Sequence, residues 1–221
     1  MGLNLLAIGI AYLIGSIPNG LLVVWLISGK DVRTIESGRT GGTNAMRAAG
    51  FVAGLITTLL DILKGAGVVW IARWIAPGAF WVEVLAAIVA VIGHNYSIYL
   101  IERKENGKLR LRGGAGGTCA LGGAIGLWPW SALFIAPLAI FSFVVIGYAS
   151  AATLTVGFVS IVVFVVRAWL GDGPWVYVAY GIVAELLIIW ALRPNIKRII
   201  DGTERPVGLR AARVKKQQAQ K

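Results

Sequence analysis

Two glycine-rich segments of this 221-residue sequence carry the residue types that bind phosphate. The first runs from Ser37 to Arg47 and reads Ser-Gly-Arg-Thr-Gly-Gly-Thr-Asn-Ala-Met-Arg. Glycines let several backbone N–H groups point into one concavity, where hydroxyl and guanidinium groups add further donors. A flexible loop whose arginines only follow the positive-inside rule would have the same composition, and both interpretations stay open. The candidate ligands are Ser37, Arg39, Thr43, Asn44 and Arg47.

The second segment reads Arg-Gly-Gly-Ala-Gly-Gly and leads directly into an apolar stretch that begins at Thr118. Its form resembles a phosphate cradle, but it is not a Walker A loop because no Lys-Ser or Lys-Thr pair follows the glycines. Gly113 and Gly117 also have GxxxG spacing, so close helix packing is the alternative. The candidate ligands here are Arg112, Gly113, Gly114, Gly116 and Gly117.

Ionisable residues also interrupt the apolar segments, where a charge costs about 2.5–3.5 kcal/mol on insertion scales. Asp61 and Lys64 are three residues apart and share one helix face. A functional pair is the first hypothesis, and a structural ion pair that neutralises itself is the alternative. Glu185 is more isolated and favours a packing role. His94 is the only histidine, which suits either a general base or a hydrogen-bonding helix end.

Several kinds of chemistry are excluded by what the sequence lacks. One cysteine, Cys119, and one histidine are too few soft ligands for a zinc site, and we expect neither a metal nor a cofactor. The residue five positions after His94 is Tyr99 rather than an acid, and no G-x-S-x-G elbow occurs. A Ser–His hydrolase is therefore not expected.

The elements that must position these residues are membrane-spanning helices. The chain is 57% hydrophobic and 14% charged, with a mean hydropathy of +0.78, which lipid accommodates and a soluble domain of this size does not. We predict an all-α protein in which glycine or proline interrupts the apolar runs at residues 15–20 and 128–130. The seven expected spans cover about residues 3–27, 51–74, 80–100, a short helix from 118, a second helix to 148, 151–170 and 175–192.

The charge distribution orients these spans. Of 21 Lys and Arg residues, eighteen lie in residues 30–47, in residues 103–112 or after Leu192, which predicts that all three regions are cytoplasmic. An odd span count then places the N terminus outside and the C terminus inside. The net charge of +11 suits anionic lipids or phosphorylated substrates rather than nucleic acid. Residues 1–208 should form one transmembrane domain, and residues 209–221 a basic, disordered tail. Six tryptophans fit an outer aromatic belt: Trp70, Trp74, Trp81, Trp128, Trp130 and Trp175.

Taken in order, these segments resemble the motifs of the bacterial acyl-phosphate-dependent glycerol-3-phosphate acyltransferases, which are small seven-span enzymes of the cytoplasmic membrane. The resemblance covers nearly the whole chain. It rests on Gly15-Ser16-Ile17-Pro18, on Ser37 to Arg47, on Asp61 to Gly65 as a D-x-x-K-G motif, on Gly93-His94 with the glycine loop, on Ser150, and on Asn195 to Glu204.

The resemblance implies transfer of a fatty acyl group from acyl phosphate to the 1-hydroxyl of glycerol 3-phosphate, giving lysophosphatidate and inorganic phosphate. It implies catalytic roles for Ser37, Asn44, Arg47, Lys64 and His94. Ser37 and Asn44 would orient the acceptor, and His94 would contribute a hydrogen bond. Substrate binding would fall to the remaining motif residues, among them Arg39, Thr43, Asp61, Arg112, Ser150, Asn195, Lys197 and Glu204, together with the loop glycines.

The sequence departs from the family pattern at three places. Ala115 stands where the glycine motif usually has its phosphate-binding lysine, Arg39 stands where the first motif usually has asparagine, and residues 102–111 form a longer and more charged loop. Arg39, Arg110 or Arg112 could supply the lost cation. The alternative function is a catalytically impaired paralogue, or a transporter that binds anionic lipid precursors on the cytoplasmic face.

Overall fold

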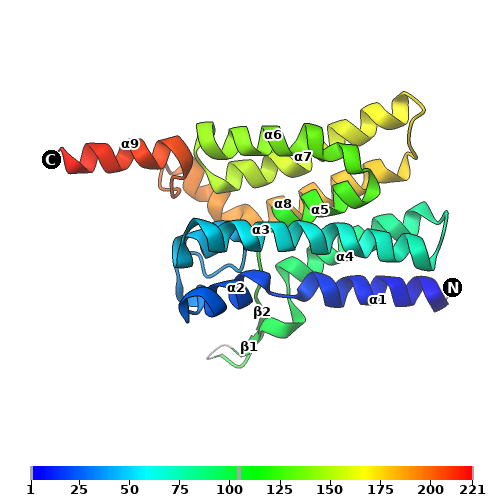
Figure 1. The fold of residues 1–221 in the computed structure, drawn as a ribbon, viewed down its shortest axis with the longest axis horizontal. Coiled ribbons are helices and arrows are strands. Elements are labelled where there is room, and N and C mark those ends of the chain that lie inside the picture. Colours follow the sequence, from blue (N-terminus) through cyan, green and yellow to red (C-terminus); the bar gives the residue numbers. More distant parts are fainter. Residues whose placement is uncertain (1, 104–105, 221) are drawn as a thin grey trace.

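The structure, a computed structural model, describes residues 2–103 and 106–220, and its long helices run side by side (Figure 1). The N terminus and the C terminus lie at opposite ends of the long axis. The elements are α1 (Gly2–Ser16), α2 (Asn19–Ser28), η1 (Val32–Thr34), α3 (Gly42–Ile75), α4 (Phe80–Asn95), η2 (Ile98–Leu100), β1 (Ile101–Arg103), β2 (Leu109–Leu111), α5 (Gly117–Leu127), η3 (Pro129–Ser131), α6 (Ala132–Phe141), the π-helical turn η4 (Ser142–Ile146), α7 (Ala149–Trp169), α8 (Val176–Ile200) and α9 (Gly208–Ala219).

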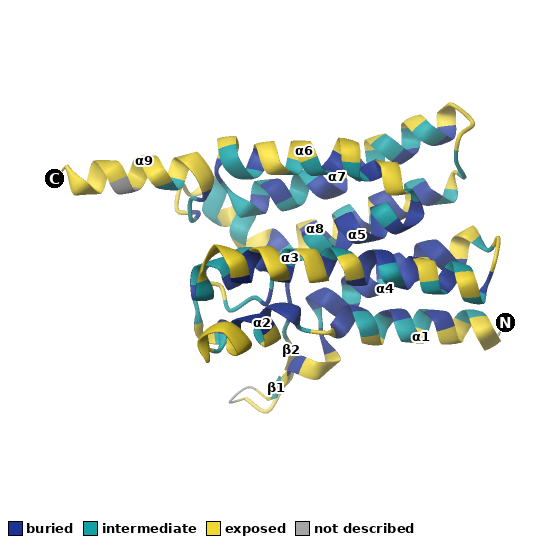
Figure 2. Cartoon of the chain, in the orientation of Figure 1, coloured by how far each residue is buried: buried dark blue, intermediate teal, exposed yellow. Residues whose placement is uncertain are grey.

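The predicted helical membrane architecture is confirmed. Within the described residues, six helical stretches are long and apolar enough to cross a membrane, and the short apolar helix α5 accompanies them. Exposed positions lie on the outside of the bundle and buried positions face its interior (Figure 2), and many of the exposed positions carry large apolar side chains. The termini at opposite ends fit an odd number of passes. Which end faces the cytoplasm stays a prediction.

The first span is broken where the sequence predicts. Helix α1 ends at Ser16 and α2 begins at Asn19, so the chain is not helical at Ile17 and Pro18. Backbone groups freed by such a break need partners inside the protein. The carbonyl oxygen of Ile17 accepts a hydrogen bond of 2.8 Å from Lys64 Nζ on α3. The buried lysine thus stabilises the break.

Helix α3 begins earlier than expected. Residues 42–48, which we predicted to belong to a loop, are already helical, and the chain changes direction at Ala49 and Gly50 before the long helix continues. Gly50 has a φ of +86°, a conformation that glycine adopts at little cost. The prediction of a loop was wrong because the kink, rather than the start of the helix, falls at Gly50.

Small residues allow the central helices to pack closely. A Cβ atom at Gly122 of α5 would collide with the backbone of Ile62 on α3, and one at Gly126 would collide with Val69. The GxxxG spacing of α5 therefore serves helix packing, as in other membrane bundles. Helices α1 and α4 approach in the same way at Gly15, which lies against Ala90.

Two regions between and after the spans also differ from expectation. Residues 101–117, predicted as a loop, contain the antiparallel hairpin β1–β2. The last span does not end at Leu192, because α8 continues through Pro194 to Ile200. Where the composition suggests a disordered tail after residue 208, the structure has the mostly exposed helix α9.

A charged cluster joins four elements at the end of the bundle that holds the N terminus. Arg73 of α3 donates from Nε and Nη2 to the two carboxylate oxygens of Glu83 on α4, at 3.0 and 2.7 Å. Tyr177 of α8 donates to the same carboxylate at 2.7 Å. Arg73 Nη2 also donates to the carbonyl oxygen of Gly126, near the C-terminal end of α5, at 3.1 Å. We call these residues the clasp.

Candidate active site

Two neighbouring cavities lie at the opposite end of the bundle from the clasp. The larger has a volume of about 1070 Å³ and the smaller about 120 Å³. The smaller cavity lies where α3 and α5 begin, and the C-terminal part of α8 contributes to both. Five residues line both cavities: Ser37, Arg39, Asn195, Arg198 and Arg205.

All but three of the predicted site residues line one or both cavities. The residues that come together in this way are Ser37, Arg39, Thr43, Asn44, Arg47, His94, Arg112, Gly113, Gly114, Gly116, Gly117, Ser150, Asn195 and Glu204. Asp61, Lys64 and Lys197 line neither cavity. Segments far apart in the sequence thus meet at one end of the bundle, as their shared basic character predicts.

The side chain of Asn44 holds the first loop, which connects α2 to α3, in place. Its amide nitrogen lies 2.9–3.0 Å from the carbonyl oxygens of Val32, Ile35 and Arg39, to which it donates. Its Oδ1 is buried and has no hydrogen-bond partner among the described residues. Because three loop carbonyls converge on this one amide, Asn44 fixes the direction in which the loop crosses the start of α3.

Arg39 lies where the two cavities meet. Its Nη2 donates to the carbonyl oxygen of Ala191 on α8 at 2.5 Å, which holds the guanidinium against that helix. Burial lowers the pKa of Arg39, and the nearby positive charge of Arg198 lowers it further, although Glu204 opposes this. Arginine remains protonated in proteins, so the lowered pKa reflects a cation that is partly deprived of water. An anion bound beside Arg39 would offset that cost.

The glycine loop packs directly on His94. Gly114 donates its backbone N–H to the carbonyl oxygen of His94 at 2.8 Å, and a Cβ atom at Gly114 would collide with the imidazole. Gly113 accepts a backbone hydrogen bond of 3.3 Å from Thr40, which joins the loop to the first motif. Glycine is needed here because the backbone approaches the ring so closely.

The start of α5 faces the smaller cavity. Ala115, Gly116, Gly117 and Thr118 line it, and the helix begins at Gly117. The first N–H groups of a helix have no partner within the helix and carry a partial positive charge, which favours an anion. The methyl group of Ala115 stands beside these groups, so this side chain adds no charge to the site.

Behind the smaller cavity, Asp61 and Lys64 form a buried pair. Asp61 is fully buried, and its Oδ1 lies 2.9 Å from Lys64 Nζ and accepts a 3.0 Å hydrogen bond from Asn19. The same oxygen is 3.6 Å from Nδ1 of His94, and Oδ2 accepts a 3.4 Å hydrogen bond from Thr118. Because His94 and Thr118 do line the cavity, they separate the pair from it.

Glu204 holds together the C-terminal motif, which runs from Asn195 to Glu204. Its Oε1 accepts hydrogen bonds from Ser150 on α7 at 3.2 Å and from Asn195 on α8 at 2.8 Å, while Oε2 pairs with Arg198 at 2.8 Å. The carboxylate is buried. One acid therefore holds Asn195 and Arg198, which line both cavities, and Ser150, which lines the smaller one.

Sequence reasoning missed several arginines. Arg198 and Arg205 line both cavities, whereas Lys197 is exposed to solvent. A helical pattern gives the missing signal, because Asn195 and Arg198 are three residues apart and follow the buried Leu192 at the same spacing. The larger cavity also has Arg33 and Arg193, which we did not predict, and Arg110, which we named only as a possible replacement for the missing lysine.

Arg112, unlike Arg39, forms an ion pair with a carboxylate. Its Nε forms a 2.6 Å ion pair with Glu102 in the hairpin, and its Nη1 donates to the carbonyl oxygen of Arg33 at 3.2 Å. Arg112 thus fixes the hairpin to the first loop. Of the cations that could replace the lysine missing at Ala115, Arg39 is the one that lines both cavities.

A bundle of membrane helices that collects arginines, helix N–H groups and a histidine around two cavities is typical of an integral membrane protein that handles phosphate-bearing molecules. Comparison with known proteins identifies its family. Residues 5–202 match the family model described as glycerol-3-phosphate acyltransferase. The chain therefore belongs to the glycerol-3-phosphate acyltransferase family.

Individual relatives agree with this assignment. A glycerol-3-phosphate acyltransferase of Thermus thermophilus is 38% identical over 202 residues, which cover 91% of this chain and 94% of the relative. Glycerol-3-phosphate acyltransferase 2 of Moorella thermoacetica is 35% identical over 213 residues, with 94% and 99% covered. The crystal structure of PlsY (YgiH), an integral membrane glycerol 3-phosphate acyltransferase in its glycerol 3-phosphate form, superposes with a TM-score of 0.78. It is 32% identical, and the match covers 93% of this chain and 96% of that one.

These similarities confirm the resemblance seen in the motifs. They also confirm the prediction that the protein is a membrane-embedded acyltransferase rather than a transporter.

Proposed function

We propose that the protein transfers a fatty acyl group from acyl phosphate to the 1-hydroxyl of glycerol 3-phosphate, releasing inorganic phosphate and lysophosphatidate. One observation carries the proposal within the family assignment: two cavities meet at a shared set of arginines. A donor and an acceptor that both carry phosphate need such an arrangement, because their negative charges must be neutralised before they can approach.

The cavities suit different substrates. The smaller one takes the compact glycerol 3-phosphate, with the N terminus of α5, Arg47 and Thr43 around it. The larger one has apolar residues in its wall as well as arginines, and takes the acyl phosphate. Arg39 and Arg198, which line both, would contact the phosphate of the donor as it leaves.

The chemistry asks the protein for position and charge more than for a strong base. The hydroxyl oxygen of the acceptor attacks the carbonyl carbon of a mixed anhydride, the new ester bond forms, and the bond from that carbon to the phosphate oxygen breaks. The phosphate leaves with the bonding electrons, and one of its oxygens takes the hydroxyl proton. Holding both substrates in line supplies most of the acceleration, and arginines stabilise the leaving charge.

His94 contributes a hydrogen bond at this step. Its Nδ1 lies 3.6 Å from the buried Asp61 carboxylate, and its Nε2 lies on the side of the glycine loop. A carboxylate beside Nδ1 favours the tautomer that is protonated there, which leaves Nε2 as an acceptor that orients the substrate hydroxyl until its proton passes to the leaving phosphate. Asp61 and Lys64 act through His94 and through the broken first span, so we propose positioning roles for both.

We further propose that the protein resides in the bacterial cytoplasmic membrane with its N terminus outside and its site at the cytoplasmic face. The gathering of basic residues at the cavities supports this orientation. A reporter that is active only outside the cytoplasm should work at the N terminus and stay silent at the C terminus. Equal signals from both fusions would contradict the orientation.

The activity itself is tested with purified protein in lipid nanodiscs. Acyl phosphate and glycerol 3-phosphate together should yield lysophosphatidate and phosphate in equal amounts, in the presence of a chelator and without nucleotide. Omitting the acceptor and replacing the donor by acyl-coenzyme A are the controls. Phosphate release without lysophosphatidate, or equal use of acyl-coenzyme A, would contradict the proposal.

A further inference from the structure

The hairpin between α4 and α5 has one largely apolar face. Strands β1 and β2 pair antiparallel, with Ile101 opposite Leu111 and Arg103 opposite Leu109. Side chains alternate along a strand, so these four residues share one face, while Glu102 and its partner Arg110 share the other. The hairpin therefore presents two chemically different surfaces.

The apolar face is exposed. Leu109 is 73% accessible and Ile101 is 51% accessible, and Ile98 and Tyr99 immediately before the hairpin are exposed as well. A cluster of this kind on a small protein surface normally marks a contact with a membrane or another protein. Basic residues lie beside it, with Arg103 and Lys108 exposed toward the turn of the hairpin.

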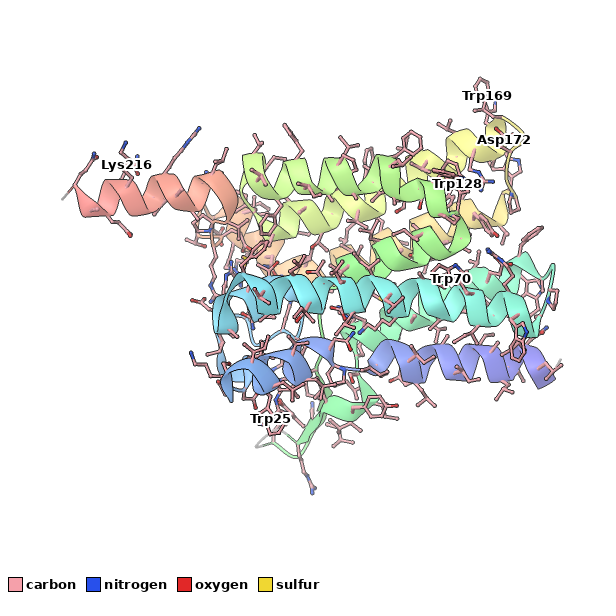
Figure 3. The ribbon with its side chains drawn as sticks, in the orientation of Figure 1. Trp25, Trp70, Trp128, Trp169, Asp172 and Lys216 are labelled. Carbon is pink, nitrogen blue, oxygen red and sulfur yellow. The ribbon has the colours of Figure 1, made fainter. Side chains whose placement is uncertain are left out.

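The position of the hairpin decides between these contacts. It projects sideways from the bundle, across the direction of the long helices, whereas α9 continues beyond their ends (Figure 1). Trp25 of α2, which is 62% accessible, points toward the same side of the molecule (Figure 3). Trp25 belongs to the stretch Gly2–Ser28, which is long and apolar enough to cross a membrane, so a bilayer around that stretch would reach this side of the molecule.

We propose that the β1–β2 hairpin lies in the headgroup region of the membrane, with its apolar face on the lipid chains and its basic residues on anionic headgroups. Exposed apolar residues beside Lys or Arg are typical of segments that bind the membrane interface. The hairpin then forms the wall of the larger cavity that faces the lipid.

The hairpin is also joined firmly to the site. Ile101, Leu109 and Leu111 line the larger cavity. At its base, Arg112 pairs with Glu102 and donates its backbone N–H to the carbonyl oxygen of Leu100 at 3.1 Å. The residue that follows Arg112 begins the glycine loop. If the proposed function is right, the chain of an acyl phosphate passes along the apolar face of the hairpin while its phosphate reaches Arg39.

The membrane contact is tested with nitroxide labels on single introduced cysteines. The native Cys119 is fully buried, so the unmodified protein serves as the labelling blank. In nanodiscs that contain anionic lipid, a label at Leu109→Cys should collide more with oxygen, which concentrates in the bilayer, than with a water-soluble nickel chelate. A label at Asn106→Cys, beside the turn, should show the reverse. Water-like values at both positions would overturn the proposal.

The passage of the acyl chain is tested separately. Leu109→Asp should lower the preference for long-chain over short-chain acyl phosphate about tenfold, because a contact with roughly one leucine side chain is lost. The matched control is Leu209→Asp on α9, which is 50% accessible and lines neither cavity, and it should keep the parental preference. An unchanged preference in Leu109→Asp would overturn the route along the hairpin. A parent protein without acyl transfer would refute the proposed function and leave the label experiment to decide the membrane contact.

Discussion

Arginine side chains lie at both ends of the helical bundle, one in the clasp and several at the cavities, but their surroundings differ. In the clasp, Arg73 pairs with a buried carboxylate, and its Nη2 also donates to the backbone carbonyl oxygen of Gly126. At the cavities, Arg39 donates to a backbone carbonyl, and no salt bridge joins Arg39 or Arg47 to any residue that the structure describes. The clasp neutralises its arginine within the protein, whereas Arg39 and Arg47 line the cavities without a carboxylate partner among the described residues.

This difference separates a structural charge from a functional one. A cation that is paired with a buried carboxylate stabilises the packing of the helices around it and gains less from a bound anion. A cation that is partly desolvated and lacks a carboxylate partner gains most from a bound anion. The buried pair Asp61–Lys64 is intermediate, since it is neutralised within the protein but touches residues that line the smaller cavity.

The largest expected effect on stability concerns the clasp. Glu83→Ala leaves Arg73 without its carboxylate and Tyr177 without its acceptor. We expect the free energy of unfolding to fall by about 3 kcal/mol. This is the low end of the range for broken buried ion pairs, because the Arg73 side chain is 42% exposed. Thermal unfolding in detergent measures this loss. Glu83→Gln, which keeps an acceptor, should lose less, and the KM for glycerol 3-phosphate should stay unchanged in the folded fraction of either variant. A shifted KM would mean that the two ends are not independent.

Arg39→Ala should have the opposite effect, lowering the activity and leaving the stability unchanged. Losing a charge-assisted hydrogen bond costs about 1.5–3 kcal/mol, so kcat/KM should fall roughly tenfold to a hundredfold. The unfolding temperature should not fall, because a partly desolvated cation is removed. Ala115→Lys in the Arg39→Ala background should restore part of the activity, since residue 115 lines the smaller cavity.

Arg112→Ala is the matched comparison for Arg39. We expect a smaller kinetic loss, accompanied by lower stability, because Arg112 joins the hairpin to the first loop. An active Arg39→Ala variant beside an inactive Arg112→Ala variant would reverse the assignment of the cation that compensates for Ala115.

Two adjacent residues on α8, Arg198 and Lys197, allow a similar comparison in which the expected changes in kcat/KM are smaller. Arg198→Ala should lower kcat/KM about tenfold, because Arg198 lines both cavities and pairs with Glu204. Lys197→Ala should change it less than about twofold, since an exposed surface charge contributes little. Equal losses of kcat/KM in the two variants would show that the positive charge of this region matters, but that it makes no difference whether the side chain faces the cavities or the solvent.

The smallest effect is expected at Asp31 in the first loop. Its hydrogen bonds with Arg33 are the largest cause of the lowered pKa of this carboxyl. A lowered pKa in the folded state adds stability above the usual aspartate pKa of 3.8, and this stability is lost as the pH falls through the folded-state value. Because the pair is partly exposed, Asp31→Asn should cost less than about 1 kcal/mol at pH 7. Unfolding curves of variant and parent should converge in acid, and a difference that persists there would contradict this origin.

Much of this protein is legible in its sequence because the membrane constrains it strongly. A span needs a long apolar run, and a break inside one must contain residues such as Gly15 and Pro18. Glycine-rich segments beside basic residues are equally recognisable, since few structures other than an anion site or a close packing contact require them. The helical fold, the broken first span and the gathering of the motifs at one end were predictable for these reasons.

The tertiary structure alone decided which side chains face the cavities. Because α8 continues through Pro194, Arg198 rather than Lys197 turns toward the site, and the spacing from Leu192 to Arg198 distinguishes the two residues only once the helix is known to continue. Asn44 donates to three loop carbonyls, and Asp61 with Lys64 lies one layer behind the cavity. A side chain's role depends on which atoms other helices bring within hydrogen-bonding distance, and those distances follow from packing rather than from residue type.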